Sequence, residues 1–559
     1  MLRKLFPFLN WFPVNRAILR ADFIAGLTVA LVLIPQSMAY ADLAGLPPWV
    51  GLYTGFLPVI VGALWGSSNH LNTGPVATSS LLTATVLIGM NGATGTDLMT
   101  TAAMLAVLVG VIRLLIGFLR LTFVANFISR PVLEGFTHAC VLVIASSQLG
   151  KIAGLQMSKS GNYLRDLWEV LLRFDDLNPV SLTIGLGSIA VLVVIKKYAP
   201  KWPGALIVVV FSICAVYFGK LHEGVHAVKV VGEVPAGLPK FVWAVPDWDT
   251  SLQMLSGAAA IIVISFMEMC SVSKAIAAQS KQRLNLNQEI IGQGLASISS
   301  GLSGGYPVSG SFSRSALNFA SGARTGLSSV VAGLFILVFL LFFTKYLYFL
   351  PQPALAAIII VSIVKLLNFG CFIKFWEASW LDGMAAVITF VCALLFAPQV
   401  QNGIFVGIVV ALCVYLYETM KPRVVIVGEH ADGTLREAGE PGLTLDEEMP
   451  LIRVDSRIFF ANSAWVEDAI LRVESEHPNA KVIALSCEGM NGIDSTGVEM
   501  LRDLSARLRD GGVRLILIGL KNQVEEVFKR ARLDKDLGEE NLFRTLQQAR
   551  IELKKYDSV

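Results

Sequence analysis

The sequence is poor in charged residues. Only 16% of its 559 residues are charged, against about 25% in an ordinary soluble protein, and 54% are hydrophobic. About 10% of residues 1–421 are charged, with a net charge of +9, against about 32% of residues 422–559, with a net charge of −6. We therefore predict that the first part lies in a membrane and that the second is a soluble domain. The overall net charge of +3 averages two unlike parts and indicates no nucleic-acid partner.

Cysteine is scarce as well. The seven cysteines are scattered, mostly lie in apolar segments and do not have the spacing of metal ligands. We therefore expect neither disulfides nor a metal site, and no cofactor. No Walker loop or catalytic triad is recognisable, so the sequence does not indicate an enzyme. The basic N-terminal segment has no small-residue cleavage site, and we expect the first apolar run to remain as a span.

Long apolar runs fill the first 424 residues. A spanning helix needs about 20 apolar residues, and this length leaves about 30 for each of fourteen spans with its loop. The predicted spans lie near residues 22–42, 47–66, 74–91, 97–119, 132–150, 178–196, 203–220, 252–278, 287–304, 310–320, 325–345, 353–368, 380–397 and 401–420. We predict a transport domain over 1–424, a linker over 425–445 and a second domain over 446–559.

Basic residues of the short loops follow the even-numbered spans. Such residues are retained on the cytoplasmic side of a membrane. They are Lys196, Lys197, Lys201, Lys281, Arg283, Arg324, Lys421 and Arg423, and Arg3, Lys4, Arg16 and Arg20 precede the first span. Both chain ends and the charged C-terminal part are therefore predicted in the cytoplasm, with the transport domain in the plasma (inner) membrane.

Two of the predicted spans are interrupted by small and polar residues. Residues 72–80 read NTGPVATSS and residues 304–315 read GGYPVSGSFSRS. The two segments occupy corresponding places in two halves of the membrane part, which is typical of inverted-repeat transporters with a site at the bilayer midplane. We predict seven plus seven spans in an inverted repeat, with both segments extended at first and helical after the glycine.

Two half-helices would then begin near mid-membrane with their N-termini facing each other. Unpaired N–H groups and the helix dipole favour an anion there. Thr78, Ser311 and Ser313 would add hydroxyl donors, and Arg314 would add a full charge, which costs at least about 2.5 kcal/mol at that depth. The alternative is that these hydroxyls only cap kinked helices while Arg314 pairs with a carboxylate.

Three further polar residues lie within apolar runs. Glu268 is the candidate proton carrier, because a carboxylate in a poorly solvated site can exchange protons near neutral pH. The alternative is a static ion pair of Glu268 with Arg314 or Lys274. Gln36 and Tyr40 are four residues apart and share one face of the first span. They either bond a substrate oxyanion or hold neighbouring helices together.

The C-terminal part alternates β-rich runs with amphipathic stretches, which predicts an α/β domain with one sheet and helices on its face. Strands are predicted at 451–454, 458–460, 481–486 and 513–518, and helices near 463–475, 495–509, 522–531 and 540–555. Asp494, Ser495 and Thr496 form a candidate regulatory loop. Asp494 or Ser495 would cap the following helix, and a phosphate on Ser495 would be stabilised there, although capping alone explains these residue types.

Together these motifs resemble the sulfate permease (SulP) family of anion transporters. The resemblance rests on residues 35–41 (PQSMAYA), 51–53 (GLY), 74–75 (GP) and above all 310–318 (GSFSRSALN). The C-terminal part resembles the STAS domain of that family, with residues 494–497 at its signature loop.

The resemblance implies a polytopic α-helical membrane protein with a core (spans 1–4 and 8–11) and a gate (spans 5–7 and 12–14). It implies elevator-type alternating access and a homodimer. The implied anion site consists of Gln36, Tyr40, the helix start at Val76, Ala77 and Thr78, the carboxylate of Glu268, and the helix start at Ser311, Phe312, Ser313 and Arg314.

The function predicted from this resemblance is symport of sulfate, or of a related inorganic anion, with protons. Glu268 would carry the proton, and the STAS domain would support the dimer or receive a cytoplasmic regulator. Sodium-coupled transport of bicarbonate or dicarboxylates is the alternative within transport. A nucleobase permease, which shares the fold without a STAS domain, and a channel or sensor are the alternatives from other classes.

Overall fold

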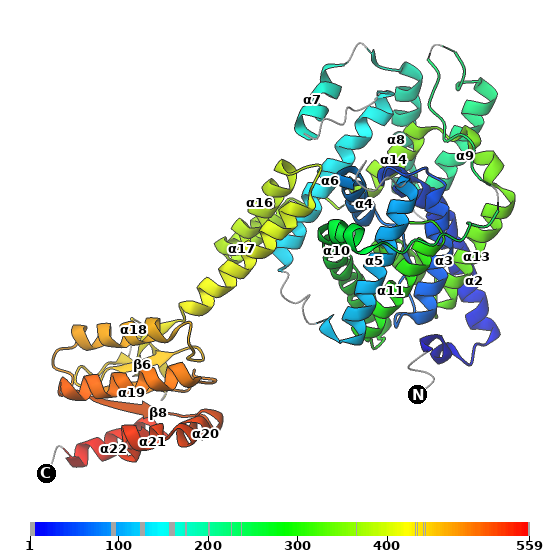
Figure 1. Ribbon diagram of the computed structural model, residues 1–559. Helices are drawn as coiled ribbons and strands as arrows, with labels where there is room; N and C mark the ends of the chain where they lie inside the picture. The colour runs from blue at the N-terminus through cyan, green and yellow to red at the C-terminus, as the bar shows by residue number, and fades with distance from the viewer. Residues whose placement is uncertain are drawn as a thin grey trace. The chain divides into compact units, whose positions relative to one another are not determined.

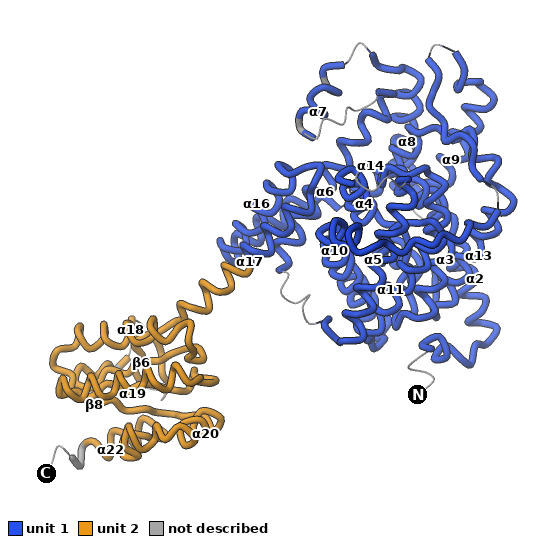
Figure 2. The backbone as a smooth tube through the Cα atoms, viewed as in Figure 1, with its two compact units in different colours: residues 1–411 blue, residues 412–559 orange. Residues whose placement is uncertain are grey.

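The chain folds into two compact units, residues 1–411 and 412–559 (Figure 2). The computed structural model describes residues 6–556 apart from 91–96, 123–128, 156–162, 174–175, 200–201, 225, 236, 365, 431, 433, 440 and 442. The predictions made for Arg3, Lys4 and Lys201 fall outside the described residues. The division between the units lies within the last helix of the membrane part, Gln401–Met420.

The described residues of the first unit form helices joined by loops, together with one short pair of strands (Figure 1). They are α2 (Arg16–Leu43), α3 (Val50–Trp65), α4 (Ala77–Met90), α5 (Leu98–Phe118), α6 (Arg130–Ala153), α7 (Tyr163–Leu172), α8 (Pro179–Tyr198), α9 (Gly204–Gly219), α10 (Trp248–Ser280), α11 (Leu286–Leu302), α12 (Phe312–Ala320), α13 (Leu327–Phe342), α14 (Gln352–Val364), α15 (Gly370–Ala378), α16 (Trp380–Leu395) and α17 (Gln401–Met420). Each of the predicted spans overlaps one of these helices, and some helices extend beyond the predicted bounds. Helices α7 and α15 were not predicted, because ten and nine residues are too short for a span.

The lengths of these helices differ more than the predicted spans do. Within the described residues, six helices are long and apolar enough to cross a membrane, and six shorter apolar helices have 10–17 residues. Helix α2 begins six residues before the predicted span, because the side chain of Asn15 caps it by accepting a hydrogen bond from the N–H of Ile18 at 2.8 Å. A fourteen-span count therefore remains a prediction.

Helix packing divides the first unit into two groups. Helices α2, α3, α4, α5, α10, α11, α12 and α13 pack mainly on one another, and α6, α8, α9, α14 and α16 form the second group. Helix α2 joins the groups through its contacts with α9 and α14. The division into a core and a gate stays a prediction.

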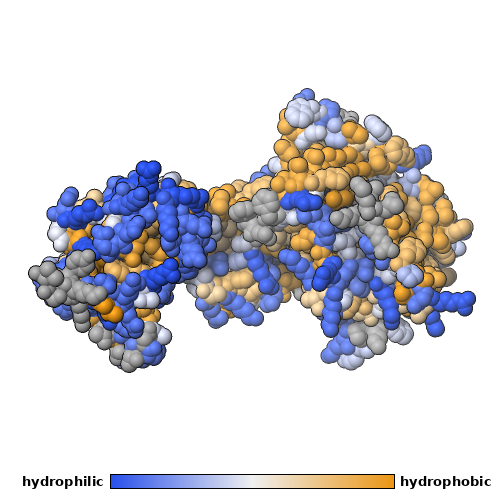
Figure 3. Space-filling model, turned by 90° about the horizontal axis from the view of Figure 1, so that it is seen from below, coloured by the Kyte–Doolittle hydropathy of each residue, from blue (hydrophilic) through white to orange (hydrophobic). Residues whose placement is uncertain are grey.

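Large apolar side chains cover much of the first unit's surface, which is broadly orange in Figure 3. Phe211 and Phe218 of α9 are 71% and 80% exposed, and Leu115 of α5 is 54% exposed. Apolar surface of this extent is stable in contact with lipid rather than with water.

The second unit is a seven-stranded sheet with helices on both faces, among the residues described. Its strands are β3 (Val424–His430), β4 (Leu435–Glu437), β5 (Leu443–Thr444), β6 (Leu451–Val454), β7 (Val482–Ser486), β8 (Arg514–Ile518) and β9 (Leu542–Phe543), in the order β4-β3-β6-β7-β8-β9 with β5 beside β3. Strands β6 to β9 are parallel, and β3 is antiparallel to β4, β5 and β6.

Alternation along the strands gives this sheet two apolar faces. Ile483 and Leu485 belong to the larger core, which is formed with α18 (Ser463–Glu476), α19 (Ser495–Asp510), α20 (Asn522–Ala531) and α21 (Leu533–Leu537). Ala484 faces a smaller core, which is formed with α22 (Leu546–Tyr556).

The strand predicted at 458–460 is wrong, because Ile458 makes only an isolated bridge with Ile493. Residues 425–445, for which a linker was predicted, contain β4, β5 and most of β3, since the β-branched run 424–427 pairs with β6.

Candidate functional site

A two-residue strand precedes each of the half-helices α4 and α12. Strand β1 (Thr73–Gly74) pairs with β2 (Ser309–Gly310) in antiparallel orientation, with Thr73 opposite Gly310 and Gly74 opposite Ser309. Helix α4 begins three residues after β1, and α12 begins two residues after β2. The pairing brings the two helix starts together, and each first turn has N–H groups without a partner inside its helix.

Arg314 joins the two interrupted segments. Its Nε donates a hydrogen bond to Oδ1 of Asn72 at 2.8 Å, and its Nη1 donates to the carbonyl oxygen of Pro75 at 2.8 Å. The side chain is fully buried, and its Nη2 has no hydrogen-bond partner in the described part of the chain. Arg314 therefore has one free donor beside the start of α4. The role of Asn72 was not predicted from the sequence, since an asparagine before Thr-Gly-Pro is equally typical of a turn.

Glu268 of α10 faces α4. Its Oε1 accepts a hydrogen bond from the hydroxyl of Thr78 at 2.7 Å, and its Oε2 is buried without a partner among the described residues. An ion pair with Arg314 or Lys274, one alternative from the sequence, is not formed within the described residues, because the guanidinium of Arg314 bonds Asn72 and Pro75 instead. Arg113 of α5, Tyr40 of α2 and Cys140 of α6 are among the titratable groups that interact electrostatically with Glu268.

Gln36 and Tyr40 lie on α2, which packs against both α4 and α12. Both side chains are buried, and Oε1 of Gln36 has no partner in the described structure. Tyr40 is near Arg314 as well as Glu268. The helix that carries both residues therefore packs on the two half-helices, and a role of Gln36 and Tyr40 in anion binding stays a prediction.

The remaining predicted residues form the helix starts themselves. Val76, Ala77 and Thr78 are buried at the start of α4. Oγ of Ser311 caps α12 by accepting a hydrogen bond from the N–H of Arg314 at 3.4 Å and lies 3.5 Å from Oγ of Ser313. Phe312 is 58% exposed, so its side chain points away from the packed interior. The N–H groups of the two first turns favour an anion at these helix starts.

Arg113 is a second buried arginine of the core helices, and its role was not predicted. It lies on α5 and is 2% exposed. A single arginine within the apolar run 97–119 was a signal that could have identified it, because an ionisable residue inside a span is functional by default.

One group of side chains could hold a metal ion, although no metal ligands were predicted. Glu134, His138 and Cys371 bring their ligand atoms within 4.8 Å of one another. His138 uses both ring nitrogens already: Nδ1 donates to the carbonyl oxygen of Glu134 at 2.7 Å, and Nε2 accepts from the N–H of Asn368 at 2.8 Å. The imidazole therefore holds α6 against the segment before α15.

The candidate regulatory loop of the second unit is a helix cap. Oδ1 of Asp494 accepts a hydrogen bond from the N–H of Gly497 at 2.9 Å, and its Oδ2 accepts from the N–H of Phe460 at 2.9 Å. Ser495 and Thr496 are exposed in the first turn of α19. Asp494 is thus the N-cap, and the hydroxyl of Ser495 is accessible.

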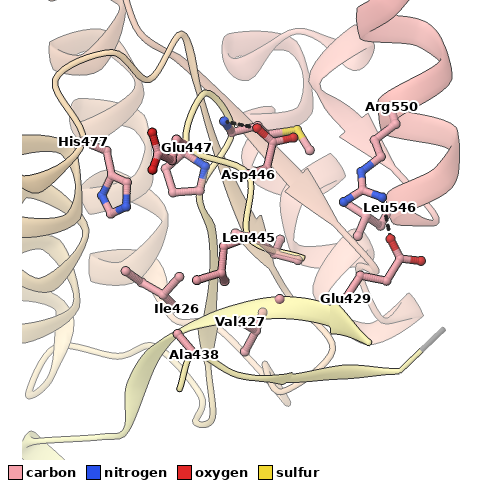
Figure 4. Close-up of a pocket in the computed structure, with 14 residues that line it drawn as sticks. Ile426, Val427, Glu429, Ala438, Leu445, Asp446, Glu447, His477, Leu546 and Arg550 are labelled. Atoms are coloured by element: carbon pink, nitrogen blue, oxygen red, sulfur yellow. Dashed lines mark hydrogen bonds and ion pairs between the residues drawn. The ribbon is translucent and has the colours of Figure 1, made fainter. Parts of the chain in front are cut away.

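The second unit has a pocket of about 200 Å³, and residues 494–496 do not line it (Figure 4). Residues of β3, the segment before β6, the end of α18 and α22 line it, including Val427, Leu445, His477 and Arg550. Arg550 pairs with Glu429 at 2.5 Å, so its charge is neutralised within the pocket wall.

Comparison with protein families now identifies the chain. Residues 19–389 match the model of the sulfate permease family, and residues 441–549 match the STAS domain. The chain belongs to the sulfate permease family. It is therefore an integral membrane protein and an anion transporter with a C-terminal STAS domain, and it is not an enzyme.

Known relatives match over almost the whole chain. It is 32% identical over 557 residues to "Probable sulfate transporter 4.2" of Arabidopsis thaliana, covering 96% of this chain and 82% of the relative. It is 30% identical over 592 residues to the "Sodium-independent sulfate anion transporter" of Bos taurus, covering 99% and 92%. Its fold matches that of murine Solute Carrier 26 family member A9, an anion transporter, with a TM-score of 0.89 at 22% identity, covering 98% of this chain and 94% of the other.

Proposed function

We propose that this member of the sulfate permease family is a proton-coupled sulfate symporter. The anion is held between the starts of α4 and α12, and Glu268 carries the proton. We propose sulfate as the substrate, rather than another anion, because the relatives reported above bear the names of sulfate transporters. The name of the bovine relative also favours a coupling ion other than sodium.

The observation that carries the proposal is a set of buried polar atoms without partners. Within the described residues, Nη2 of Arg314, Oε2 of Glu268 and Oε1 of Gln36 are buried and lack hydrogen bonds, and all three belong to the predicted site. A buried polar atom without a partner costs about 1–3 kcal/mol. Sulfate would accept a hydrogen bond from Nη2 of Arg314 and would offset the cost of that one atom, and it would also accept from the first-turn N–H groups of α4 and α12. The two free oxygens are acceptors, which sulfate does not satisfy, and a proton on Glu268 would change its carboxylate into a donor.

A proton on Glu268 explains how the carboxylate and the anion share one site. An ionised carboxylate repels sulfate, and protonation removes that repulsion while it supplies one hydrogen-bond donor. The bond from Thr78 then connects the protonation of Glu268 to the start of α4. Binding of the anion and binding of the proton therefore favour each other, which is the requirement for symport.

The proposed transport cycle moves the core helices against the gate helices. The packing of α2–α5 with α10–α13, and of α6, α8, α9, α14 and α16 with one another, supports a division into two bodies. We propose fourteen spans in a seven-plus-seven inverted repeat, elevator-type alternating access and a homodimer, with both chain ends in the cytoplasm. The STAS domain would support the dimer or receive a cytoplasmic regulator.

Uptake of labelled sulfate into proteoliposomes tests the proposal. An inward proton gradient should drive accumulation of sulfate, and an ionophore that collapses the gradient should abolish it. Labelled bicarbonate is measured in parallel, with and without sodium. Bicarbonate uptake that requires sodium, without sulfate uptake, would replace the proposed substrate and coupling ion.

A further inference from the structure

Two arginines are the largest side chains that are fully buried in the described part of this protein. One is Arg314 of the proposed site, and the other is Arg113, which lies on α5 and has no part in the proposed function so far. An arginine cannot lose its charge in a protein under ordinary conditions. Arg113 therefore places a permanent positive charge in the interior of the membrane part.

Every hydrogen bond of Arg113 goes to an uncharged group. Its Nη1 donates to Oγ of Ser297 at 2.7 Å and to the carbonyl oxygen of Val308 at 2.8 Å, and its Nη2 donates to Oγ of Ser265. No ion pair of Arg113 is found in the described residues. The charge is thus held in place without being neutralised by direct contact.

These contacts involve two elements of the proposed anion site, α10 and the segment that leads into β2. Ser265 is one helical turn before Glu268 on α10, and Val308 immediately precedes β2, which leads into α12. Oγ of Ser309 donates to the carbonyl oxygen of Ser265 at 3.4 Å and closes the same cluster. Arg113 therefore positions both the helix that carries Glu268 and the strand that sets the start of α12.

The buried charges around the site can be counted. Arg113 and Arg314 are positive, and Glu268 interacts electrostatically with Arg113. Tyr40 and Cys140, two further titratable groups that interact with Glu268, are of types that are uncharged at neutral pH. The net charge is +1 when Glu268 is ionised and +2 when it is protonated. A doubly charged anion neutralises the protonated site, whereas a singly charged anion leaves one buried charge unbalanced.

We propose that Arg113 is a positioning residue whose uncompensated charge makes the anion site prefer doubly charged over singly charged anions. The inference rests on the proposed function, because it assumes that sulfate binds between α4 and α12. Arg113 acts on the anion through the electric field of its charge and by positioning β2 and α10, and its side chain does not contact the anion. One unit of charge roughly 10 Å away, at an effective dielectric constant of about 20, changes the preference by about tenfold.

The test compares the affinities of the purified full-length protein for sulfate and for nitrate by titration calorimetry. In Arg113→Gln the ratio of the nitrate to the sulfate dissociation constant should fall about tenfold. In Arg113→Lys, which keeps the charge, the ratio should stay near that of the unmodified protein. An unchanged ratio in Arg113→Gln, or an equal fall in Arg113→Lys, would overturn the proposal, because a merely structural role moves both affinities together.

A second pair of variants avoids an unpaired buried carboxylate. Glu268→Gln and the double variant Arg113→Gln/Glu268→Gln differ only in the charge of Arg113, and the double variant leaves neither buried charge alone. The same roughly tenfold fall in the ratio is expected between them, and equal ratios would overturn the inference. Failure of the unmodified protein to bind sulfate at all would instead overturn the proposed function and this inference with it.

Discussion

Buried polar atoms without hydrogen bonds are uncommon in folded proteins. Here such atoms of Gln36, Glu268 and Arg314 belong to residues that were selected from the sequence as an anion site. Glu268 and Arg314 are held in place by hydrogen bonds of their other polar atoms, and Gln36 is held by packing in the interior. At the scale of single residues, the proposed site therefore combines one free donor, on Arg314, with two free acceptor oxygens, on Gln36 and Glu268.

The carboxylate of Glu268 gives the most specific prediction at this scale. Glu268→Gln keeps the bond with Thr78 possible but removes the exchangeable proton, so proton-driven accumulation of sulfate should be abolished while sulfate exchange continues. The measurement is uptake and counterflow of labelled sulfate in the same proteoliposomes. Glu233→Gln, at an exposed position, is the matched control. Accumulation that still follows the proton gradient in Glu268→Gln would assign the coupling to another group.

At the scale of elements, the pairing of β1 with β2 determines where the two half-helices begin. Gly74 in β1 allows the guanidinium of Arg314 to approach: a Cβ at this position would lie 3.1 Å from Nη2 and 3.3 Å from a methyl group of Val59. The one donor of Arg314 that is free thus lies beside the glycine. The small residues of the interrupted segment are explained by this close approach.

Gly74→Ala should therefore displace the guanidinium of Arg314. We expect sulfate affinity to fall about tenfold, since overpacking of this kind costs about 1–3 kcal/mol. The control is Gly89→Ala in α4, where a Cβ would meet no atom within 4 Å. Calorimetric titration of sulfate measures both variants. Equal affinity in Gly74→Ala and Gly89→Ala would show that the free donor of Arg314 does not bind the anion.

The cap of α19 gives a prediction for the second unit. Asp494→Ala removes acceptors for the N–H groups of Gly497 and Phe460 and should lower the free energy of unfolding by about 1–2 kcal/mol. Ser495→Ala, one position on, should leave it nearly unchanged. Urea unfolding of residues 421–559, followed through Trp465, the single tryptophan of that segment, measures the difference. A larger loss in Ser495→Ala than in Asp494→Ala would contradict the assignment of the cap.

Elements could be predicted well where one local signal determines them. The apolar runs gave the helices of the membrane part, and the strand at 451–454 and the helix at 522–531 agree to the residue with β6 and α20. The contacts of Arg113 and Asn72 could not be predicted, because they join segments about 150 to 240 residues apart. The strands within 425–445 were missed because β3 is stabilised by pairing with β6 rather than by its own sequence.

At the scale of the whole molecule, two units with different surfaces share one chain. The first exposes apolar side chains and holds every residue of the proposed anion site, whereas the second has two apolar cores of its own on either face of one sheet. This separation predicts that substrate choice resides in the first unit alone.

Removal of residues 423–559 tests that separation. The truncation should lower the rate of sulfate transport or the fraction of dimer, because the second unit supports assembly or regulation in the proposed function. The ratio of sulfate to nitrate affinity should stay the same. Transport assays, size-exclusion chromatography with light scattering and titration calorimetry give the three quantities. A changed affinity ratio would show that the STAS domain contributes to substrate selection.

The central claim is that Arg314, held between Asn72 and Pro75, donates to sulfate at the meeting point of α4 and α12. The most direct measurement is the affinity of the purified protein for sulfate after Arg314→Ala, with Arg324→Ala, at an exposed position, as control. Loss of one partner of a buried charged hydrogen bond costs at least about 2 kcal/mol, so the affinity should fall at least about thirtyfold in Arg314→Ala. It should be unchanged in Arg324→Ala. A folded Arg314→Ala protein that binds sulfate as tightly as the control would contradict the account.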